Sequence, residues 1–157
     1  MTREQREALW ERVVSRDIRG FDIRGVEDQR LIGECSLSRI TWPRGSAEIA
    51  VAIFDGDDRG RGHGTEAVQL LIAYGIDCFG LNRLSMRYLA VNDAVVRACE
   101  RSADAIGGRI VGIERQGEWA FGAHQDCVIM EFLATDFPPH PATAHLREAP
   151  SRVELPS

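Results

Sequence analysis

The residue types best suited to chemistry gather in one glycine-rich run, RGRGHGT, at residues 59–65. The apolar run 47–54 before it is typical of a buried strand, and apolar residues at helical spacing follow it up to Phe79. A strand that passes through such a loop into a helix presents unpaired first-turn amides, to which the helix dipole adds roughly half a positive charge. Because Arg59 and Arg61 add full charges, the run is typical of a phosphate-binding site.

The absence of lysine excludes several other kinds of site. All 19 basic residues are arginines, so neither a lysine-containing nucleotide-binding loop nor a Schiff-base enzyme fits the chain. Thr65 stands where a dinucleotide-binding fingerprint needs a third small residue. The four cysteines, Cys35, Cys78, Cys99 and Cys127, form no closely spaced pair, and no histidines are paired as ligands, so we expect no metal.

Length and composition are those of one globular domain that can bury a core. The chain has 157 residues, of which 44% are apolar and 27% charged, and its formal net charge is −5. This acidic balance argues against a nucleic-acid partner, which needs a basic surface. Since the sequence shows no leader peptide and no apolar run long enough to span a membrane, we expect a cytoplasmic protein with reduced thiols and no membrane association.

Hydrophobic periodicity and turn residues predict the elements that position the glycine-rich run. An amphipathic helix is expected at 2–17, the helix after the run ends before Gly80, and Asn92 starts a third helix that reaches Ala105. Strands are predicted at 21–26, 31–37, 47–54, 83–91, 110–115 and 127–133, with a turn at residues 116–118. The proline-rich tail 135–157 is expected to be poorly ordered. The order of elements indicates a mixed α/β layer.

The glycine-rich run also carries a family resemblance. Arg59-x-x-Gly62-x-Gly64 matches the signature with which the GNAT acyltransferases hold the pyrophosphate of acetyl-CoA. The agreement extends to RLIGECSLS (30–38), SAEIAVAI (46–53), RGRGHGTEAVQLLIAYG (59–75), LNRLSMRYLAVN (81–92) and RACER (97–101). Over residues 18–134 the chain resembles the branch that contains the ribosomal-protein N-terminal acetyltransferases of the Rim type.

The resemblance implies the GNAT acyl-CoA N-acyltransferase fold, an α/β (α+β) domain whose central mixed sheet is mostly antiparallel and flanked by helices. It implies a single domain at residues 1–134, followed by the tail 135–157. Relatives open with a strand and a helix before the helix expected at 2–17, and both are missing from this sequence. Because those elements help to wall the acceptor pocket, either a partner subunit completes the pocket or the pocket is unusually open.

The resemblance further implies acetyl-CoA as the co-substrate and assigns residues to it. The pyrophosphate would be held by Arg59, Gly60, Arg61, Gly62, His63, Gly64 and Thr65. The backbone of Ala52, Ile53 and Phe54 would pair with the pantetheine arm, and the amide near Ile53 would meet the thioester carbonyl as an oxyanion contact. Asn92 matches a family position that hydrogen-bonds either the pantetheine or a helix start.

Two further positions concern proton transfer in that resemblance. Glu48 matches the strand glutamate of the family, which implies a general base; the alternative is a solvated strand residue. Many relatives have a tyrosine that serves the leaving thiolate, and here Cys99 stands in its place. The Cys99 thiol either donates the proton or, as is commoner for a cysteine on an apolar helix face, fills the core.

The implied function is transfer of the acetyl group of acetyl-CoA to a primary amine. Acceptors in this branch include protein N-termini, polyamines and amine-bearing antibiotics, and the acidic net charge favours a cationic acceptor only weakly. Cys99 and the shortened N-terminus motivate an alternative, a catalytically impaired CoA-binding module for regulation or interaction. A nucleotide-binding module agrees with the loop alone but not with the surrounding matches. Because similar proteins are commonly dimers, a homodimer is also expected.

Overall fold

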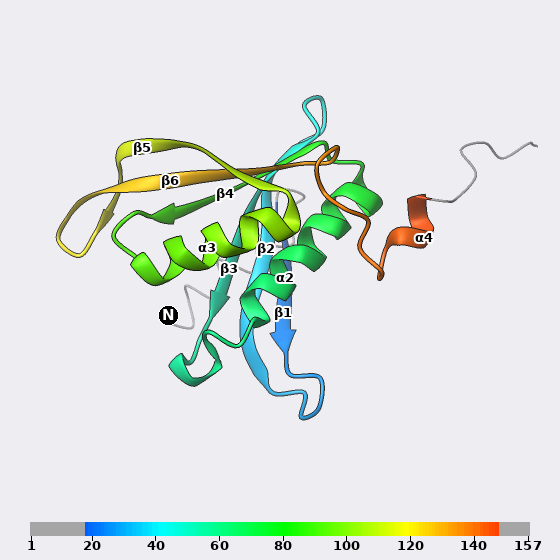
Figure 1. Ribbon diagram of the computed structural model, residues 1–157, viewed down its shortest axis with the longest axis horizontal. Coiled ribbons are helices and arrows are strands. Elements are labelled where there is room, and N and C mark those ends of the chain that lie inside the picture. The colour runs from blue at the N-terminus through cyan, green and yellow to red at the C-terminus, as the bar shows by residue number, and fades with distance from the viewer. Residues whose placement is uncertain (1–17, 148–157) are drawn as a thin grey trace, which may run out of the picture.

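The described part of the chain, residues 18–147 of the computed structural model, folds around one sheet (Figure 1). Its strands are β1 (Ile18–Arg24), β2 (Leu31–Thr41), β3 (Ser46–Ile53), β4 (Arg83–Leu89), β5 (Gly108–Ala120) and β6 (Ala123–Leu133). The order in the sheet is β1-β2-β3-β4-β6-β5, and every neighbouring pair is antiparallel except the parallel pair β3–β4. The predicted mixed, mostly antiparallel sheet is therefore confirmed.

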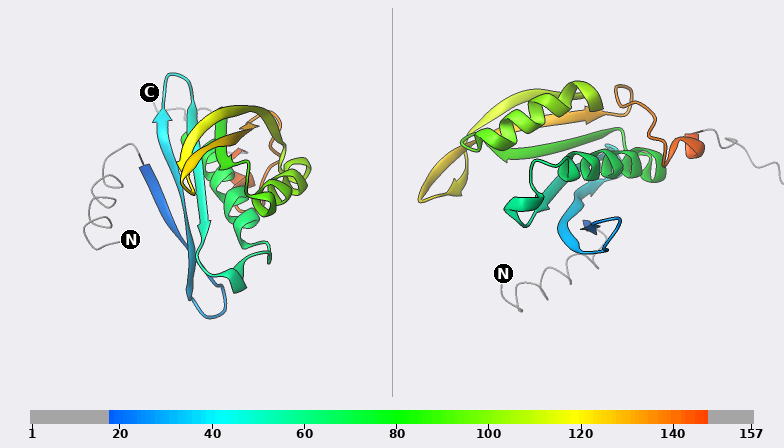
Figure 2. Two further views of the ribbon diagram at one scale, coloured as in Figure 1. Left: turned by 90° about the vertical axis from the view of Figure 1, so that its left-hand side faces the viewer. Right: turned by 60° about the horizontal axis from the view of Figure 1, so that its bottom comes forward.

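Two long helices cover one face of this sheet (Figure 2). The helical elements are the 3-10 turn η1 (Gly56–Asp58), α2 (His63–Ala73), its π-helical extension η2 (Tyr74–Cys78), α3 (Asp93–Ile106) and α4 (Ala144–Arg147). The helices and the sheet share one core, which includes Leu37, Ile49, Ile72, Leu84, Cys99, Met130 and Phe132. Gly75 allows the close approach of η2 to the sheet, because a Cβ there would lie 2.9 Å from Leu84 Cδ2.

β3 and β4 separate part of the way along their length. Their parallel pairing runs from Ser46↔Arg83 to Ile49↔Met86, although β3 continues to Ile53 and β4 to Leu89. The ends of the two strands therefore border a gap in the hydrogen-bonded sheet. This gap lies where β3 leads into the glycine-rich loop, and α2 starts from the far side of that loop.

Most predicted elements are confirmed, with shifted boundaries. α2 begins at His63, so His63 and Gly64 belong to its first turn and not to the preceding loop. Val26 was expected in a strand, but it lies in the turn after β1 and is 88% exposed.

The turn predicted at residues 116–118 is wrong. β5 runs through this segment to Ala120, and the chain reverses at residues 121–122. A register shift between Glu114 and Glu118 absorbs the extra residues as a bulge, in which Gln116 adopts φ +52°. The Gln116 amide donates to Asp126 Oδ1 at 2.8 Å, so β6 supplies a partner inside the bulge.

The segment after β6 is partly packed against the domain. Within the described portion of the predicted tail, residues 135–147, Phe137 is only 4% exposed and α4 follows it. Arg147 Nε lies 2.6 Å from Asp77 Oδ1 of η2, which ties α4 to the end of the long helix. Residues 135–147 thus contact the domain, and the poor order expected of the tail 135–157 stays a prediction. The helix expected at 2–17 lies outside the described residues.

Candidate functional site

The loop between β3 and α2 has an open outer face. Gly60 has φ +73° and Gly62, the N-cap of α2, has φ +91°, and both values lie in the region that favours glycine. A Cβ atom built at either position would meet nothing within 4 Å. A ligand can therefore reach the loop backbone here without displacing any described side chain.

The first turn of α2 presents amide donors at the same face. The first helical hydrogen bond runs from the Glu66 amide to the Gly62 carbonyl at 2.9 Å, so the amides of His63 and Gly64 precede it. Gly62 provides no side chain that could cap them. A helix N-terminus in this state attracts anions through its amides and its dipole. The donors present therefore fit a phosphate or a diphosphate.

Arg59 points back towards the strand that precedes the loop. Its Nε and Nη2 both donate to the Ile53 carbonyl at 3.1 Å, and Nη2 also donates to the Phe54 carbonyl at 3.1 Å. The guanidinium thus binds the carbonyl groups at the end of β3 and holds the loop against this strand. The sequence predicted a direct role at the pyrophosphate and did not predict this contact.

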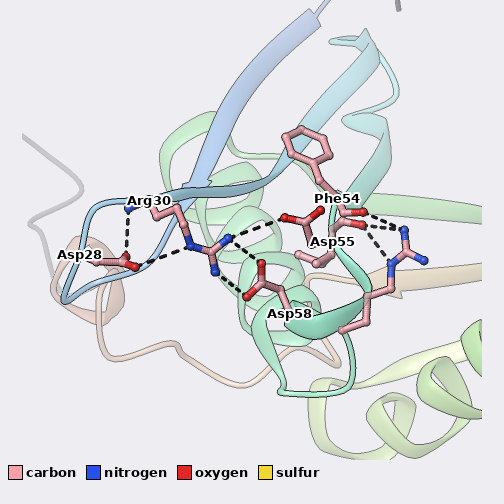
Figure 3. Close-up of polar contacts among 7 residues, drawn as sticks. Asp28, Arg30, Phe54, Asp55 and Asp58 are labelled. Carbon is pink, nitrogen blue, oxygen red and sulfur yellow. Dashed lines mark hydrogen bonds and ion pairs between the residues drawn. The ribbon is translucent and has the colours of Figure 1, made fainter.

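A cluster of charged side chains anchors the loop to the hairpin between β1 and β2 (Figure 3). Arg30 donates from Nη1 to Asp58 Oδ2 at 2.9 Å and from Nη2 to Asp58 Oδ1 at 2.7 Å. Asp58 is only 5% exposed, and the hydrogen bonds from Arg30 hold the pKa of its carboxyl below the usual value. The Arg30 amide donates to Asp28 Oδ1 at 3.0 Å, and Asp55 Oδ2 lies 3.8 Å from the Arg30 guanidinium.

At the end of β3, the backbone N–H and C=O groups of successive residues point alternately towards β2 and towards the gap. The Phe54 amide donates to the Ile32 carbonyl on the β2 side at 3.0 Å, so it is not available to a ligand in the gap. In an antiparallel pair the residues alternate between bonding the partner strand and pointing away from it. By this alternation Val51 and Ile53 direct their backbone groups towards the gap, whereas Ala52 faces β2. The expectation that the backbone of Ala52, Ile53 and Phe54 would all face the gap is therefore wrong, because only Ile53 of these three does so.

Glu48 lies in the paired part of β3, on the sheet face away from α2. Ile49 beside it points into the core, so the alternation of the strand directs Glu48 to the opposite face. Its neighbours in register are Ser38 on β2 and Ser85 on β4. The side chain is 47% exposed, and its Oε1 lies 3.4 Å from Arg39 Nη1. This carboxylate is accessible to solvent and ligand, which agrees with both alternatives that the sequence left open.

The two α3 residues predicted from the sequence have different surroundings. Asn92 is the N-cap of the helix, and its Oδ1 accepts from the Val95 amide at 3.2 Å, which is the helix-start alternative. Cys99 is 8% exposed within the core, and burial raises the pKa of its thiol. A protonated thiol among apolar side chains agrees with the core-filling alternative.

Tyr88 is a buried polar residue that the sequence analysis did not single out. Its side chain on β4 is 9% exposed in the core, and its hydroxyl forms no hydrogen bond of good geometry with the groups that the structure describes. Burial raises the pKa of Tyr88 to about 12, with smaller contributions from Cys99 and Glu100. The one feature of the sequence that could have indicated Tyr88 is its place at an inward position of an alternating strand, because a buried tyrosine hydroxyl usually needs a hydrogen-bond partner.

A separate groove lies between α2 and the β1–β2 hairpin. Its volume is about 740 Å³, and the rings of Phe21 and Tyr74, 5.2 Å apart between centroids, form part of its wall. Arg61 from the loop and His63 from the first turn of α2 also line this groove. These two side chains therefore border the groove, whereas the open glycine backbone forms the outer face of the loop.

Other kinds of site find little support in the described part of the chain. No group of three or more His, Cys, Asp or Glu side chains within it could hold a metal ion. None of its helices has the length and apolar character needed to cross a membrane. All four cysteines are free thiols.

Comparisons with known proteins agree with the geometry. Residues 1–102 match the sequence profile of an acetyltransferase (GNAT) domain, and no functionally curated protein matches the chain. Spermidine N-acetyltransferase from Vibrio cholerae, in complex with CoA and spermine, has a TM-score of 0.76 and 20% identity over 87% of this chain and 78% of its own. A dodecameric structure of that enzyme in an intermediate state has a TM-score of 0.73 and 20% identity over 84% of this chain and 74% of its own.

Proposed function

Because the chain belongs to the GNAT acetyltransferase family, and is thus an acetyl-CoA-dependent N-acetyltransferase, we propose which of its parts bind the co-substrate. The loop between β3 and α2 holds the pyrophosphate, and the gap between β3 and β4 holds the pantetheine arm. The observation that carries this assignment is the continuity of the two features. β3 leaves β4 after Ile49 and runs directly into the loop whose outer face is open.

The pyrophosphate contacts are mainly contacts to the backbone. The amides of His63 and Gly64 precede the first hydrogen bond of α2, and Gly60 and Gly62 leave the approach clear. Arg59 supports the loop through the carbonyls of β3. The remaining members of the run, Arg61 and Thr65, complete the proposed site.

The pantetheine arm pairs with every second residue of β3. The backbone groups of Val51 and the Ile53 amide face the gap. An extended arm in the gap forms hydrogen bonds with them in place of β4, which does not pair with β3 beyond Met86. The Ile53 amide is then the donor nearest the thioester carbonyl, where negative charge develops during acyl transfer.

Glu48 is the proposed general base. A primary amine is mostly protonated at neutral pH, so a carboxylate must remove a proton before the nitrogen can attack the carbonyl carbon. Glu48 lies one residue before the last β3–β4 pair and is open to solvent, and a water molecule can extend its reach. As the new C–N bond forms, the C–S bond breaks and CoA leaves as a thiolate.

The proposed acceptor is a small cationic amine of the polyamine class. The similar Vibrio cholerae enzyme is a spermidine N-acetyltransferase and binds spermine, and this chain carries a net charge of −5. Glu34 and Glu48 both lie on the sheet face away from α2, where their charges attract a cation. We also propose a cytoplasmic homo-oligomer; the dodecameric neighbour supports assembly, and the free thiols support a reducing compartment.

The alternative function is a CoA-binding module that does not transfer the acetyl group. The buried thiol of Cys99, at the position where relatives have a tyrosine, is the observation that favours it.

Thermal unfolding with and without acetyl-CoA, together with CoA-thiol release on an amine panel, tests both functions. We expect acetyl-CoA at 100 times its Kd to stabilise the protein by about 2.7 kcal/mol, and thiol release with spermidine to exceed that with a peptide N-terminus or an aminoglycoside. Stabilisation without turnover on any amine would support the binding module. No stabilisation at millimolar acetyl-CoA would contradict both functions.

A further inference from the structure

We propose that Tyr88, a residue of β4 beyond its last pair with β3, donates a hydrogen bond from its hydroxyl to the sulfur of the departing CoA. This inference rests on the proposed binding of acetyl-CoA in the gap between β3 and β4 and adds a catalytic residue to it. It also gives a physical reason why a cysteine is tolerated at position 99.

The first support is the position of Tyr88 in the sheet. The last β3–β4 pair is Ile49↔Met86, and Tyr88 follows two residues later on the same face of β4. It therefore lies on the unpaired part of the strand, which forms one wall of the gap. On its opposite edge β4 is held by β6 through the pair Tyr88↔Val128, so this wall is fixed.

The second support is the state of the hydroxyl. Tyr88 is 9% exposed, and its oxygen forms no hydrogen bond of good geometry with the residues that the structure describes. Buried hydroxyl groups in proteins nearly always have a partner, because a buried donor without one is costly. A sulfur atom that enters the gap beside β4 would supply the missing acceptor.

The third support is the neighbour on α3. Cys99 is buried in the same cluster, and a weak contact between its thiol and the Tyr88 hydroxyl, short of good hydrogen-bond geometry, is among the smaller causes that raise the pKa of Tyr88. A thiol is a weak acceptor, so Cys99 leaves the phenol proton available to a better acceptor such as a thiolate. Burial also keeps the phenol protonated, since it raises the pKa of Tyr88 to about 12.

The chemical step needs only a hydrogen bond from Tyr88. The base first removes a proton from the ammonium group, and the neutral amine nitrogen then attacks the carbonyl carbon. The adduct loses its second nitrogen-bound proton to water, and the C–S bond breaks with its electron pair on sulfur. Tyr88 stabilises the resulting thiolate by hydrogen bonding and keeps its proton, because a phenol with so high a pKa is a weaker acid than a thiol. The thiolate takes its proton from water after release.

The variant Tyr88→Phe tests this role, with Tyr74→Phe as the matched control. Tyr74 is the only other tyrosine and lies in the groove on the hairpin side of α2. We expect Tyr88→Phe to lower kcat about 100-fold, with the Kd of acetyl-CoA unchanged within twofold, and Tyr74→Phe to leave both constants near wild type. An unchanged kcat in a folded Tyr88→Phe variant would overturn the proposal.

A binding experiment separates this role from a structural one. We expect the wild-type protein to bind CoA more tightly than desulfo-CoA, and Tyr88→Phe to bind the two equally. Should Tyr88→Phe fail to fold, difference absorbance of tyrosine in the wild-type protein gives the answer. A perturbation on binding CoA that desulfo-CoA does not produce supports the contact, and identical spectra contradict it.

Two variants at position 99 complete the test. Cys99→Ala should keep most of the turnover, and the swap Tyr88→Val with Cys99→Tyr should recover at least tenfold over Tyr88→Phe, because it returns the hydroxyl from the helix side. If Cys99→Ala loses turnover and Tyr88→Phe does not, the thiol is the donor and the proposal is wrong. If the wild-type protein binds no acetyl-CoA, the proposed function has failed instead.

Discussion

The two edges of β4 behave differently, although they belong to one short strand. Towards β6, every residue from Arg83 to Leu89 is in register with a partner. Towards β3, pairing stops at Met86. The closed edge contributes to the stability of the sheet, and the open edge leaves backbone groups for a ligand that can act as a strand. The comparison shows that the proposed binding site depends on the backbone groups of β3 and β4 that do not pair with each other.

The surroundings of the open edge keep it open. Arg30 and Asp58 fix the loop after β3 to the hairpin, and Arg59 fixes it to the end of β3. These contacts hold the loop in one position beside the gap. Its outer face has glycines and first-turn amides instead of side chains. Rigid support on one side and bare backbone on the other are the features expected of a preorganised anion site.

The largest effect is expected from a negative charge at the open loop. Gly64→Asp places a carboxylate in the first turn of α2, where it is favourable to the helix but repels phosphates. The added Cβ meets only Ile53 Cγ1, at 3.7 Å, so the fold should persist. We expect acetyl-CoA affinity to fall at least about 100-fold by calorimetric titration. Gly56→Asp, which adds the same charge on η1 in open space, is the control, and equal losses in both variants would contradict the loop assignment.

The next effect concerns the acceptor face. Glu48→Gln removes the proposed base and should lower kcat about 10–100-fold, with little change in the Kd of acetyl-CoA. Glu34→Gln, on the same face of the neighbouring strand, should retain most of kcat. A Glu48→Gln variant with an unchanged pH–rate profile would remove Glu48 from the mechanism and leave it as a solvated strand residue.

A smaller effect is expected from the support of the loop. Asp58→Asn should weaken acetyl-CoA binding by roughly fivefold, because the loop loses its anchor to Arg30. Asp57→Asn, a change in the same turn at an exposed residue, is the control. Equal affinity in the Asp58→Asn variant would show that the cluster does not position the loop.

The same variant has a pH signature. Arg30 lowers the pKa of Asp58 in the folded state, so Asp58 contributes stability above the unfolded carboxyl pKa of about 4. This contribution is lost as the pH falls from there through the lower folded pKa. We therefore expect the difference in melting temperature between wild type and Asp58→Asn to shrink on acidification below about pH 4. A constant difference would contradict the cause assigned to the shift.

The smallest effect is expected at the closed edge. Arg83 Nε lies 2.7 Å from Glu131 Oε2 across the β4–β6 pair, but the Arg83 side chain is 47% exposed. Arg83→Ala should therefore reduce the free energy of unfolding by less than about 1 kcal/mol in denaturant titration and leave acetyl-CoA affinity unchanged. A marked loss of affinity would show that the two edges of β4 are not independent.

The sequence was sufficient for the parts of the fold that depend on local patterns. The apolar run at residues 47–54 and the glycine-rich run predicted the strand, the loop and the helix of the site, and the mixed sheet is confirmed. The β5 bulge was missed because Gln116 and Gly117 are typical of a turn, and only pairing with β6 carries the strand through them.

Within the candidate site, the directions in which several groups point could not be predicted from the sequence. The contact of Arg59 with the β3 carbonyls and the occupied Phe54 amide depend on tertiary geometry that spacing does not contain. Tyr88 was missed because a tyrosine at an inward strand position is ordinary core packing by pattern. What distinguishes it is that its hydroxyl forms no hydrogen bond of good geometry with the described part of the chain.

A crystal structure with CoA bound tests the central claim most directly. We expect the pyrophosphate oxygens within about 3.2 Å of the His63 and Gly64 amides, and the pantetheine arm along Val51 and Ile53 in the gap. A CoA molecule held instead in the groove between α2 and the hairpin, with the loop amides and the strand gap untouched, would contradict the account.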